Sequence, residues 1–432
     1  MANWRWLRPG MHIKRWVFLI TIGLIVLFIG AMFLTLGVFL PDAQPFGMDA
    51  YGTGIVFVVP GMIAVFIGIY RLLRRIEKML RRADDRRDLG EIAYQYNRLE
   101  QGPRFVCFGG GTGLSTFLSG IRDYSQRITA IVSVADDGGS SGRLRLDFDM
   151  LPPGDIRNCL VALSDTSPSM ARLLQYRFPE GEFSGHSFGN LFITVLAIIE
   201  NDFGSAIREM NRILNVRGQV LPATLDKISL VANHPDGSKT TGQQWIAKSG
   251  KEIESLELKP HPGDVSMDVL AAIRQADLIT LGPGSLFTSV LPNLLDPKVV
   301  QAINDSPARV VFIINTAGQV GETQGFTVST HLKMLKKHAP HLKIDIALVN
   351  NRPPSQEQLA KMAEKGIAPT EYDVQETGEM DVEVVLSDVV NTDNPIRHDP
   401  KKTGKAIMEI CTKSEIGRIQ AVAAASADES HQ

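Results

Sequence analysis

Residues 104–121, RFVCFGGGTGLSTFLSGI, contain the pattern that decides the fold. A short apolar run, Arg104–Phe108, is followed by the glycine-rich segment Gly109–Gly113 and then by an apolar stripe at helical spacing that begins at Leu114. Glycines allow a tight turn and a close approach of backbone to ligand, and the unpaired N–H groups at a helix start favour an anion. The stretch therefore predicts a strand, a phosphate-binding turn and a helix.

The glycine spacing separates this turn from two common nucleotide-binding motifs. It does not fit G-x-G-x-x-G, and no Lys follows as in G-x-x-x-x-G-K-[ST]. The sequence thus argues against an ordinary NAD fingerprint and against a Walker A loop, and kinase and ATPase functions lose their main support. A plain tight turn without a ligand stays open as the alternative.

Further short β-rich runs follow along the chain, most of them nearly continuous in apolar residues, with helical patterns between several of them. Strands of this kind are typical of a sheet that is covered on both faces. We therefore predict an α/β domain over residues 102–415 with a doubly wound, mostly parallel sheet, whose ligands bind beyond the carboxyl ends of the strands. The predicted strands after the first are Ile128–Val134, Ile228–Ala232, Asp277–Leu281, Arg309–Ile314 and Ile344–Val349.

A second polar cluster, ADDGGSSGR, directly follows the run Ile128–Val134. Carboxylates at the end of a second strand can accept hydrogen bonds from a ribose or hold Mg²⁺ beside a diphosphate. Small hydroxyl side chains and glycine amides can bind phosphate, and an arginine can neutralise it. An Asx-type turn with solvated charges is the alternative. The residues of this predicted site are Asp136, Asp137, Gly138, Gly139, Ser140 and Arg143.

Three later segments add polar residues at element boundaries. Gly282–Ser285 lies between a predicted strand and a helix, which makes it a second candidate anion site, and Asn315–Thr323 closes another strand in a similar way. His186, in GHSFGN, is interpreted as a structural histidine more readily than as a catalytic one because no partner is evident. Asp155, in PPGDIRN, reads as the N-cap of a helix.

The N-terminal region contains two long uncharged stretches, residues 17–40 and 52–70, each long enough to cross a bilayer. A signal peptide is the alternative for the first, but its apolar run is too long for one. The loop 41–51 has no Lys or Arg, whereas residues 1–16 and the predicted helix 71–101 are basic. The positive-inside rule therefore predicts an inner-membrane hairpin with both termini and the main domain cytoplasmic. The spans contain no ionisable residue, so we expect an anchor rather than a transporter.

Charge and cysteine usage exclude several classes of protein. The chain has 45 Lys+Arg and 47 Asp+Glu, with the basic excess in residues 1–100, so the remainder is mildly acidic and a nucleic-acid partner is not expected. Three cysteines without CxxC spacing fit a reducing compartment. HExxH and GxSxG motifs are absent from the sequence, which leaves zinc and serine hydrolysis unsupported. The tail 416–432, rich in Ala, Ser and acidic residues, is predicted to be disordered.

Six blocks in order along the chain resemble the 2-phospho-L-lactate transferase (CofD)-like superfamily. The resemblance runs from about Arg104 to His331 and implies a Rossmann-like nucleotide-binding fold. One branch transfers a phospholactyl group from a guanosine diphosphate donor with Mg²⁺; the other is the gluconeogenesis factor (YvcK-like) branch, which PPGDIRNCLVALSD resembles more closely. The blocks are GGGTGLSTFLSGI, ADDGGSSGRLR, PPGDIRNCLVALSD, GHSFGNL, LGPGSLFTSVLPNLL and NTAGQVGETQGF.

The resemblance also implies which residues contact the ligand. It places Asp136 and Asp137 near ribose, base or metal, with Mg²⁺ as a candidate cofactor and no other cofactor certain. Many relatives have Gly-Glu where this chain has Gly242-Gln243, and this departure favours binding over turnover. The remaining implied nucleotide contacts are Gly110, Gly111, Thr112, Gly113, Asn190, Gly284 and Ser285.

The expected function is a membrane-anchored regulator that binds a nucleotide-sugar of the UDP-sugar type and links carbon metabolism to cell-wall synthesis and cell shape. The alternative is a phospho-group transferase that uses a nucleotide diphosphate donor. Cell-wall synthesis proteins are candidate partners, because lipid-linked wall precursors are made at the inner face of the membrane. The sequence leaves open the base, the sugar, phosphorylation and whether the protein is a homo-oligomer.

Overall fold

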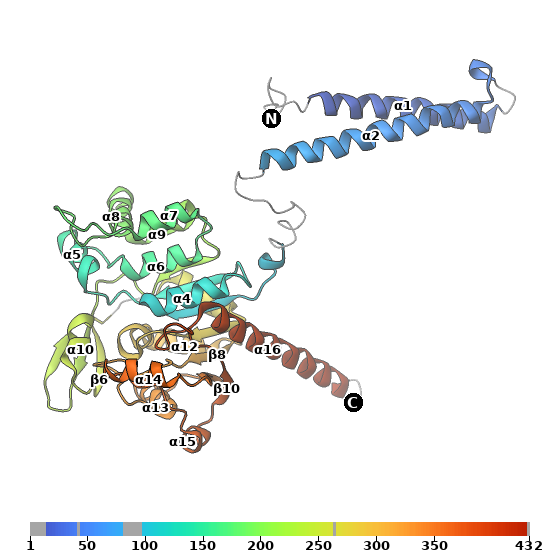
Figure 1. The fold of residues 1–432 in the computed structure, drawn as a ribbon. Helices are drawn as coiled ribbons and strands as arrows, with labels where there is room; N and C mark the ends of the chain where they lie inside the picture. Colours follow the sequence, from blue (N-terminus) through green and yellow to red (C-terminus); the bar gives the residue numbers. More distant parts are fainter. Residues whose placement is uncertain (1–13, 41–43, 81–96, 262–264, 430–432) are drawn as a thin grey trace. The chain divides into compact units, whose positions relative to one another are not determined.

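The computed structural model describes residues 14–40, 44–80, 97–261 and 265–429, which fall into two compact units (Figure 1). One unit contains the N-terminal helices, and the other begins at residue 97 and contains every sheet that the structure describes. Side chains are described up to residue 74 in the second N-terminal helix and up to residue 414 in the last helix. Most contacts of each unit lie within that unit.

The N-terminal unit is a pair of helices, α1 (Lys14–Phe39) and α2 (Ala50–Leu80), joined across a short 3₁₀ turn, Pro45–Gly47. Both helices are long and apolar enough to cross a membrane. They coincide with the two predicted spans, and α2 continues into the segment predicted as a basic helix. The rest of that predicted helix, over 81–96, lies outside the described residues.

Glycines on both helices allow close packing within the pair. A Cβ atom at Gly23 would lie 2.8 Å from Cγ2 of Val65, and one at Gly30 would lie 2.7 Å from Cγ2 of Val58. The glycines recur every seven residues, which keeps them on one face of each helix. Small residues are what membrane helices use to approach closely, so the two helices are fitted to one another. The glycines at this contact are Gly23, Gly30 and Gly37 on α1 and Gly54, Gly61 and Gly68 on α2.

The second unit is centred on a seven-stranded sheet with the order β10-β9-β8-β7-β1-β2-β3, in which all pairs are parallel. The predicted α/β architecture with a doubly wound, mostly parallel sheet is therefore confirmed. The strand order reverses at β1, so the crevice between β1 and β7 is where such a sheet binds ligands. The strands are β1 (Phe105–Gly109), β2 (Ile128–Val132), β3 (Gln219–Pro222), β7 (Leu278–Leu281), β8 (Arg309–Ile313), β9 (Ile346–Asn350) and β10 (Glu383–Ser387).

One predicted strand lies in another sheet, and four of the described strands, β3, β5, β6 and β10, were not predicted. The run Ile228–Ala232 forms β4 (Ser229–Asn233), which belongs to a separate antiparallel sheet with β5 (Lys239–Thr241) and β6 (Ser255–Lys259) rather than to the main sheet. Apolar residues alone do not show which sheet a strand joins. The strands β3 and β10, which the prediction missed, are the two edges of the main sheet.

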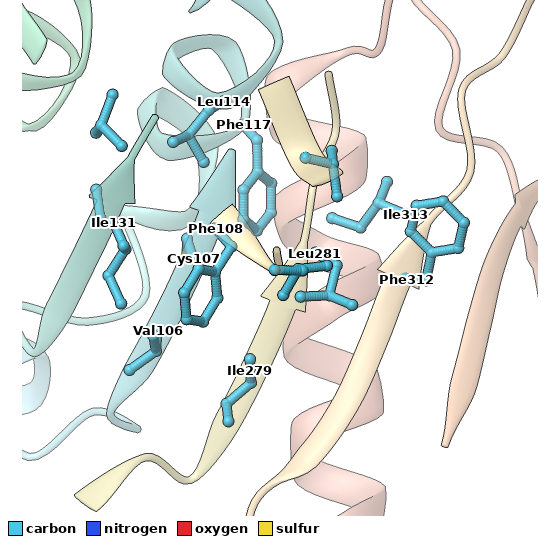
Figure 2. Close-up of a cluster of buried hydrophobic side chains, with 14 of the residues drawn as sticks. Val106, Cys107, Phe108, Leu114, Phe117, Ile131, Ile279, Leu281, Phe312 and Ile313 are labelled. Carbon is cyan, nitrogen blue, oxygen red and sulfur yellow. The ribbon is translucent and has the colours of Figure 1, made fainter. Parts of the chain in front are cut away.

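Helices cover both faces of the main sheet, and the core lies between them and the central strands. Figure 2 shows Phe108 of β1, Leu281 of β7 and Phe117 of α4 (Gly111–Ile121) close together in this core. The other α-helices are α5 (Gly139–Asp147), α6 (Gly154–Leu163), α7 (Pro168–Gln175), α8 (Phe188–Glu200), α9 (Phe203–Ile213), α10 (Gln243–Ser249), α11 (Met267–Gln275), α12 (Pro297–Asp305), α13 (Val328–His338), α14 (Gln356–Ala363), α15 (Val374–Gly378) and α16 (Pro400–Glu429).

The last helix, α16, packs closely against α4. A Cβ at Gly120 of α4 would overlap the carbonyl oxygen of Pro400, and one at Gly404 of α16 would lie 2.8 Å from the carbonyl carbon of Gly120. The backbone of α16 is helical to residue 429, where the sequence analysis predicted a disordered tail from 416. The difference has a physical reason, because alanine, which is abundant in this tail, has the highest helix propensity.

Candidate functional site

The glycine-rich turn has the predicted form of strand, turn and helix. Gly109 ends β1, Gly110 precedes the helix in an extended conformation, and α4 begins at Gly111 with φ +61°. A left-handed φ at Gly111 disfavours any residue with a side chain. The N–H groups of the first turn of α4 therefore lie at the carboxyl end of β1, beside the point where the strand order reverses, and that of Gly111 donates to Asp155.

A second glycine-rich loop, after β7, touches this turn through the backbone. A Cβ at Gly113 would lie 2.6 Å from the carbonyl oxygen of Pro283 and 2.9 Å from Cα of Gly284. Glycine is thus required at residue 113 for the two loops to meet. This contact brings together two segments that the sequence analysis had predicted separately as anion sites.

A cavity of about 390 Å³ lies where the two loops meet, and it is large enough for part of a nucleotide. Of the predicted nucleotide contacts, it is lined by Thr112, Gly113, Gly284 and Ser285. The sequence analysis did not single out the individual residues that complete its polar wall, although Asn315 and Gln319 fall within the segment Asn315–Thr323. These polar lining residues are Asn315, Gln319, Arg397 and His398.

Hydrogen bonds hold the loop after β7 in place and occupy the hydroxyl of Ser285. This hydroxyl donates to the carboxylate of Glu322 and accepts from the backbone N–H of Thr288 at 3.2 Å. Burial raises the pKa of Glu322. The side chain of Asn315 donates to the carbonyl of Gly284 at 2.8 Å. As the structure stands, Ser285 can therefore offer its backbone, but not its hydroxyl, to a ligand in the cavity.

The two residues at the C-terminal side of the cavity differ in charge. Burial lowers the pKa of His398 to about 4, and its Nε2 hydrogen-bonds to the carbonyl of Ile314 at 3.1 Å. His398 is therefore neutral at physiological pH and donates that bond. Arg397 lies beside it and is exposed. The cavity thus has one cationic side chain at its rim and a neutral imidazole in its wall.

A pair of half-buried carboxyl groups lies on the other side of the glycine turn. Asp136 accepts a hydrogen bond from the N–H of Gly138 at 3.0 Å, and Asp155 accepts one from the N–H of Gly111. Burial raises the pKa of Asp136. Burial, together with the nearby charge of Asp136, raises the pKa of Asp155 to about 7. The two carboxyl groups are therefore close enough to interact and lie directly beside the predicted phosphate-binding turn.

Asp155 has a different role from the one predicted. The residue before α6 is Pro153, which provides no side-chain cap, and Asp155 lies in the first turn of the helix. A Cβ at Gly110 would lie 3.0 Å from Oδ2 of Asp155, so this carboxyl group faces the glycine turn. The N-cap interpretation was therefore wrong. The one sequence signal for a role of Asp155 at the site is that it belongs to the family block PPGDIRN.

Asp137 is held by the small antiparallel sheet and α10. Its Oδ1 accepts a hydrogen bond from the N–H of Gln244 at 2.9 Å. A Cβ at Gly242 would overlap Oδ2 of Asp137, and Gly242 has φ +97°. The first turn of α10, which begins at Gln243, therefore binds this carboxylate, and the charge of Asp137 contributes to the raised pKa of Asp136.

A buried hydrogen-bond network connects α5, α6 and α8. The side-chain amide of Asn190 donates to Ser140 at 3.0 Å, and Nη1 of Arg157 donates to Oδ1 of Asn190 at 2.8 Å and to Ser187. His186 Nδ1 lies 3.1 Å from the Ser140 hydroxyl. Burial and the nearby Arg177 lower the pKa of Arg157 to about 10. The predicted contacts Ser140 and Asn190 thus bind each other and position α5.

The predicted site residues therefore form two groups on either side of Gly110 and Gly111. Thr112, Gly113, Gly284 and Ser285 line the cavity, whereas the segment from Asp136 to Arg143 and Asn190 lie on the carboxylate side. Arg143 donates to the carbonyl of Ser184 at 2.8 Å. The segment also contains Gly138 and Gly139, which begin α5.

A magnesium site would depend on the carboxyl pair. Within the described ranges, no group of three or more His, Cys, Asp or Glu side chains could hold a metal ion. Mg²⁺ is commonly bound by one or two carboxylates together with substrate phosphates. Asp136 and Asp155 fit that mode, so a metal would be held jointly by the protein and a bound diphosphate.

Comparison with known proteins agrees with this geometry. The family model described as 2-phospho-L-lactate transferase CofD matches residues 105–390, which include both glycine-rich loops and the carboxyl pair. The chain belongs to the CofD family. Residues 14–80, which form the helix pair, precede the matched region.

Named relatives of this CofD-family protein are gluconeogenesis factors. One from Halalkalibacterium halodurans is 46% identical over 307 residues, which are 70% of this chain and 95% of the relative. Another from Bacillus subtilis is 43% identical over 314 residues, 72% of this chain and 99% of the relative. A crystal structure of a Bacillus halodurans protein matches with TM-score 0.69 and 44% identity, covering 71% of this chain and all of that one. The predicted branch of the superfamily is therefore confirmed.

Proposed function

We propose that this CofD-family protein is a membrane-anchored regulator that binds a nucleotide-sugar of the UDP-sugar type. The observation that supports this most directly is the contact of Gly113 with Pro283 and Gly284, which joins two glycine-rich loops beside a cavity of about 390 Å³. The N-terminus of α4 offers backbone N–H groups to the diphosphate. The adjoining cavity would then receive the sugar or the base.

One feature favours binding without turnover. Gln243 stands where the family resemblance implies a carboxylate, and the adjacent Gln244 N–H binds Asp137. The polar groups that are free to contact a ligand, such as the α4 amides and Arg397, are suited to holding charge in place.

A transferase that uses a nucleotide diphosphate donor is the second candidate. The half-buried pair Asp136 and Asp155 supports it, because two carboxylates can hold Mg²⁺ beside a diphosphate, and a pKa of about 7 allows Asp155 to exchange a proton near neutral pH. In a transfer reaction, an acceptor hydroxyl would attack the distal phosphorus of the donor's diphosphate and give its proton to a base such as the Asp155 carboxylate, while the bond from that phosphorus to the bridging oxygen breaks and the nucleoside monophosphate leaves. The nucleotide product would then appear in step with the modified acceptor.

The helix pair α1–α2 would hold the protein at the inner face of the membrane. The absence of Lys and Arg from the loop 41–51 and the basic residues on both flanks of the pair support cytoplasmic termini. A UDP-sugar sensor in that position would lie where lipid-linked wall precursors are assembled. We therefore propose cell-wall synthesis proteins as its partners and control of cell shape in response to carbon supply as its role.

The test uses the full chain purified in detergent micelles, mixed with UDP-GlcNAc, UDP-glucose, GDP or NADP, each with and without Mg²⁺. A ligand that binds the folded state raises the melting temperature, and mass spectrometry then shows whether the ligand is intact. We expect stabilisation by a UDP-sugar that stays unchanged. Preference for GDP, or cleavage of any ligand, would contradict the regulator and favour the transferase. Loss of stabilisation in Gly113→Ala, but not in Ser119→Ala, would locate binding at the two loops.

A further inference from the structure

Trp245, on α10 (Gln243–Ser249), exposes a large aromatic side chain to solvent. Its exposed fraction is 60%, whereas its neighbour Ile246 is fully buried and fixes the helix on the domain. Figure 1 shows α10 beside β6, apart from the strands of the main sheet. Tryptophan is highly buried on average, and one that is this exposed contributes little to a core. The packing of α10 therefore does not account for an aromatic side chain at this residue.

The start of α10 lies beside the carboxylate side of the candidate site. The backbone N–H of Gln244 donates to Oδ1 of Asp137 at 2.9 Å. A Cβ at Gly138 would lie 3.3 Å from Oδ1 of Asp136 and 3.8 Å from Oε1 of Gln244. Asp136 belongs to the carboxyl pair that adjoins the glycine turn. The residue before Trp245 in the chain therefore contacts the segment that carries this pair.

The other end of α10 contacts the loop that follows β8. A Cβ at Gly321 would overlap the carbonyl oxygen of Ala247, so loop and helix touch through their backbones. Residues 317–320 of the same loop line the cavity. Helix α10 is thus held between the carboxylate side of the site and the cavity wall. A ligand that extends from the cavity across the glycine turn would come near it.

The indole of Trp245 lies beside a carboxylate and a cation. A Cβ at Gly242 would overlap Oδ2 of Asp137 and would lie 3.4 Å from Cδ1 of Trp245, so the ring and this carboxylate flank the same glycine. Nζ of Lys248 lies over the ring, 5.1 Å from its centroid, and this contact favours one orientation of the indole. A carboxylate can accept hydrogen bonds from a ribose, and an aromatic ring can stack on a base. The two groups together suit a nucleoside.

We propose that Trp245 is the stacking surface for the base of the bound nucleotide, with the base on the face of the indole opposite Lys248. This inference rests on the proposed nucleotide-sugar binding and assigns the two halves of the ligand. Asp137 accepts a hydrogen bond from the ribose, the diphosphate lies at the start of α4, and the sugar occupies the cavity of about 390 Å³. Because every base has a π face, Trp245 supplies affinity for a nucleotide over a sugar phosphate rather than a choice of base.

Tryptophan fluorescence of the full chain in detergent micelles tests the stacking. The chain has four tryptophans, and the other three, Trp4, Trp6 and Trp16, all precede residue 17. We expect UDP-GlcNAc and UDP to quench part of the emission, whereas GlcNAc-1-phosphate, which has no base, should leave it unchanged. The matched control is Trp245→Phe, which keeps an aromatic ring. It should bind UDP-GlcNAc within a few-fold of wild type but show no quenching.

Binding constants from calorimetry separate stacking from a structural role. Trp245→Ala should weaken UDP-GlcNAc binding about tenfold or more, because this is what a base gains by stacking on an aromatic side chain. Its binding of inorganic pyrophosphate should not change, since that probe has no base. The melting temperature without ligand should stay close to that of wild type. Val374→Ala on α15, at a residue that is 64% exposed, should change none of these values.

Two results would overturn this inference alone. Equal affinity of Trp245→Ala and wild type for UDP-GlcNAc would place the base elsewhere. An equal loss of pyrophosphate binding in Trp245→Ala would show that the indole shapes the site without contacting the base. A wild-type chain that none of UDP-GlcNAc, UDP-glucose, GDP and NADP stabilises is a separate result, because it would remove the proposed function and this inference together.

Discussion

At the scale of single residues, the candidate site depends on glycines at positions where a side chain would not fit. Gly113 has no side chain because the backbone of the next loop occupies that space, and Gly111 has none because its φ is positive. Asp155 carries a carboxyl group directly beneath this turn. The glycine-rich turn therefore has the backbone of the loop after β7 on one side and the carboxyl group of Asp155, whose pKa is about 7, on the other.

The substitution Gly113→Ala is expected to destabilise the protein by about 2 kcal/mol, because its methyl group has only backbone atoms of Pro283 and Gly284 to displace. It should also abolish ligand binding by separating the two loops. Denaturant unfolding measures the first effect and thermal stabilisation by ligand the second.

The matched control is Gly111→Ala. A Cβ at this residue lies 3.8 Å from the oxygens of Asp155, an ordinary contact, so only the left-handed φ, about 1 kcal/mol, opposes it. Equal destabilisation by the two substitutions would show that the contact between the loops is not what makes glycine necessary at residue 113.

Asp155 makes stability depend on pH. Because folding raises its pKa from 3.8 to about 7, the folded state holds the proton more tightly, and wild-type stability is lost as pH rises between these values. Asp155→Asn removes this loss, so its advantage over wild type should grow from pH 4 to pH 8, by at most about 4 kcal/mol. Thermal unfolding of both proteins across this range measures the difference, and a constant difference would contradict the raised pKa.

The sequence predicted some residues of the candidate site and missed others. The two glycine-rich loops were predicted because glycine patterns at strand ends are local in sequence. Asp155 and Glu322 were missed as site residues because their positions depend on which helices and loops the sheet brings together. The pairing of Ser140 with Asn190, which are 50 residues apart, likewise follows from the packing of α5 against α8 and not from either segment alone.

At the scale of elements, the central strands could be predicted and the edges could not. Strands β1, β7, β8 and β9 are covered on both faces, so each reads as an apolar run. The edge strand β10 has the sequence EVVLS and is half exposed. Its apolar run is too short to separate it from the surrounding loops. Burial on both faces therefore made β1, β7, β8 and β9 recognisable in the sequence, whereas the edge strand β3 was missed although most of it is buried.

The contact between α4 and α16 leaves no space for an added side-chain atom at Gly120. Gly120→Ala should destabilise the protein by about 3 kcal/mol, since its Cβ would overlap the carbonyl of Pro400, whose position is fixed by the helix that follows. Ser119→Ala, on the exposed side of the same turn, should have almost no effect. Chemical denaturation measures both. Similar values for the two would mean that α16 can move away at little cost.

At the scale of the whole molecule, the chain combines a CofD-family domain with a pair of apolar helices that are fitted to each other by glycines. Neither part supplies the function we propose without the other. The domain would bind the nucleotide-sugar, and the helix pair would confine that binding to one membrane surface. Anchoring of this kind raises the local concentration of the sensor around membrane partners.

The orientation of the helix pair can be tested with single cysteines. Met48→Cys, in the loop between the helices, should react with a membrane-impermeant maleimide on intact cells, because the positive-inside rule places that loop outside. Val374→Cys should react only after the cells are permeabilised. Background labelling should be low, since burial raises the pKa of Cys107 to about 12 and the other two native cysteines are also buried. The reverse pattern would invert the predicted topology.

The packing of α16 against α4 also affects the order in which the chain can fold during synthesis. A ribosome releases the helix pair α1–α2 first, yet β1 must wait for β7, some 170 residues later, and α4 must wait for Pro400 and Gly404. If the pair is the membrane anchor that we propose, a nascent chain can enter the bilayer long before α16 packs against α4. Truncated chains would then occupy the membrane with an incomplete site, and they would not bind the proposed nucleotide-sugar.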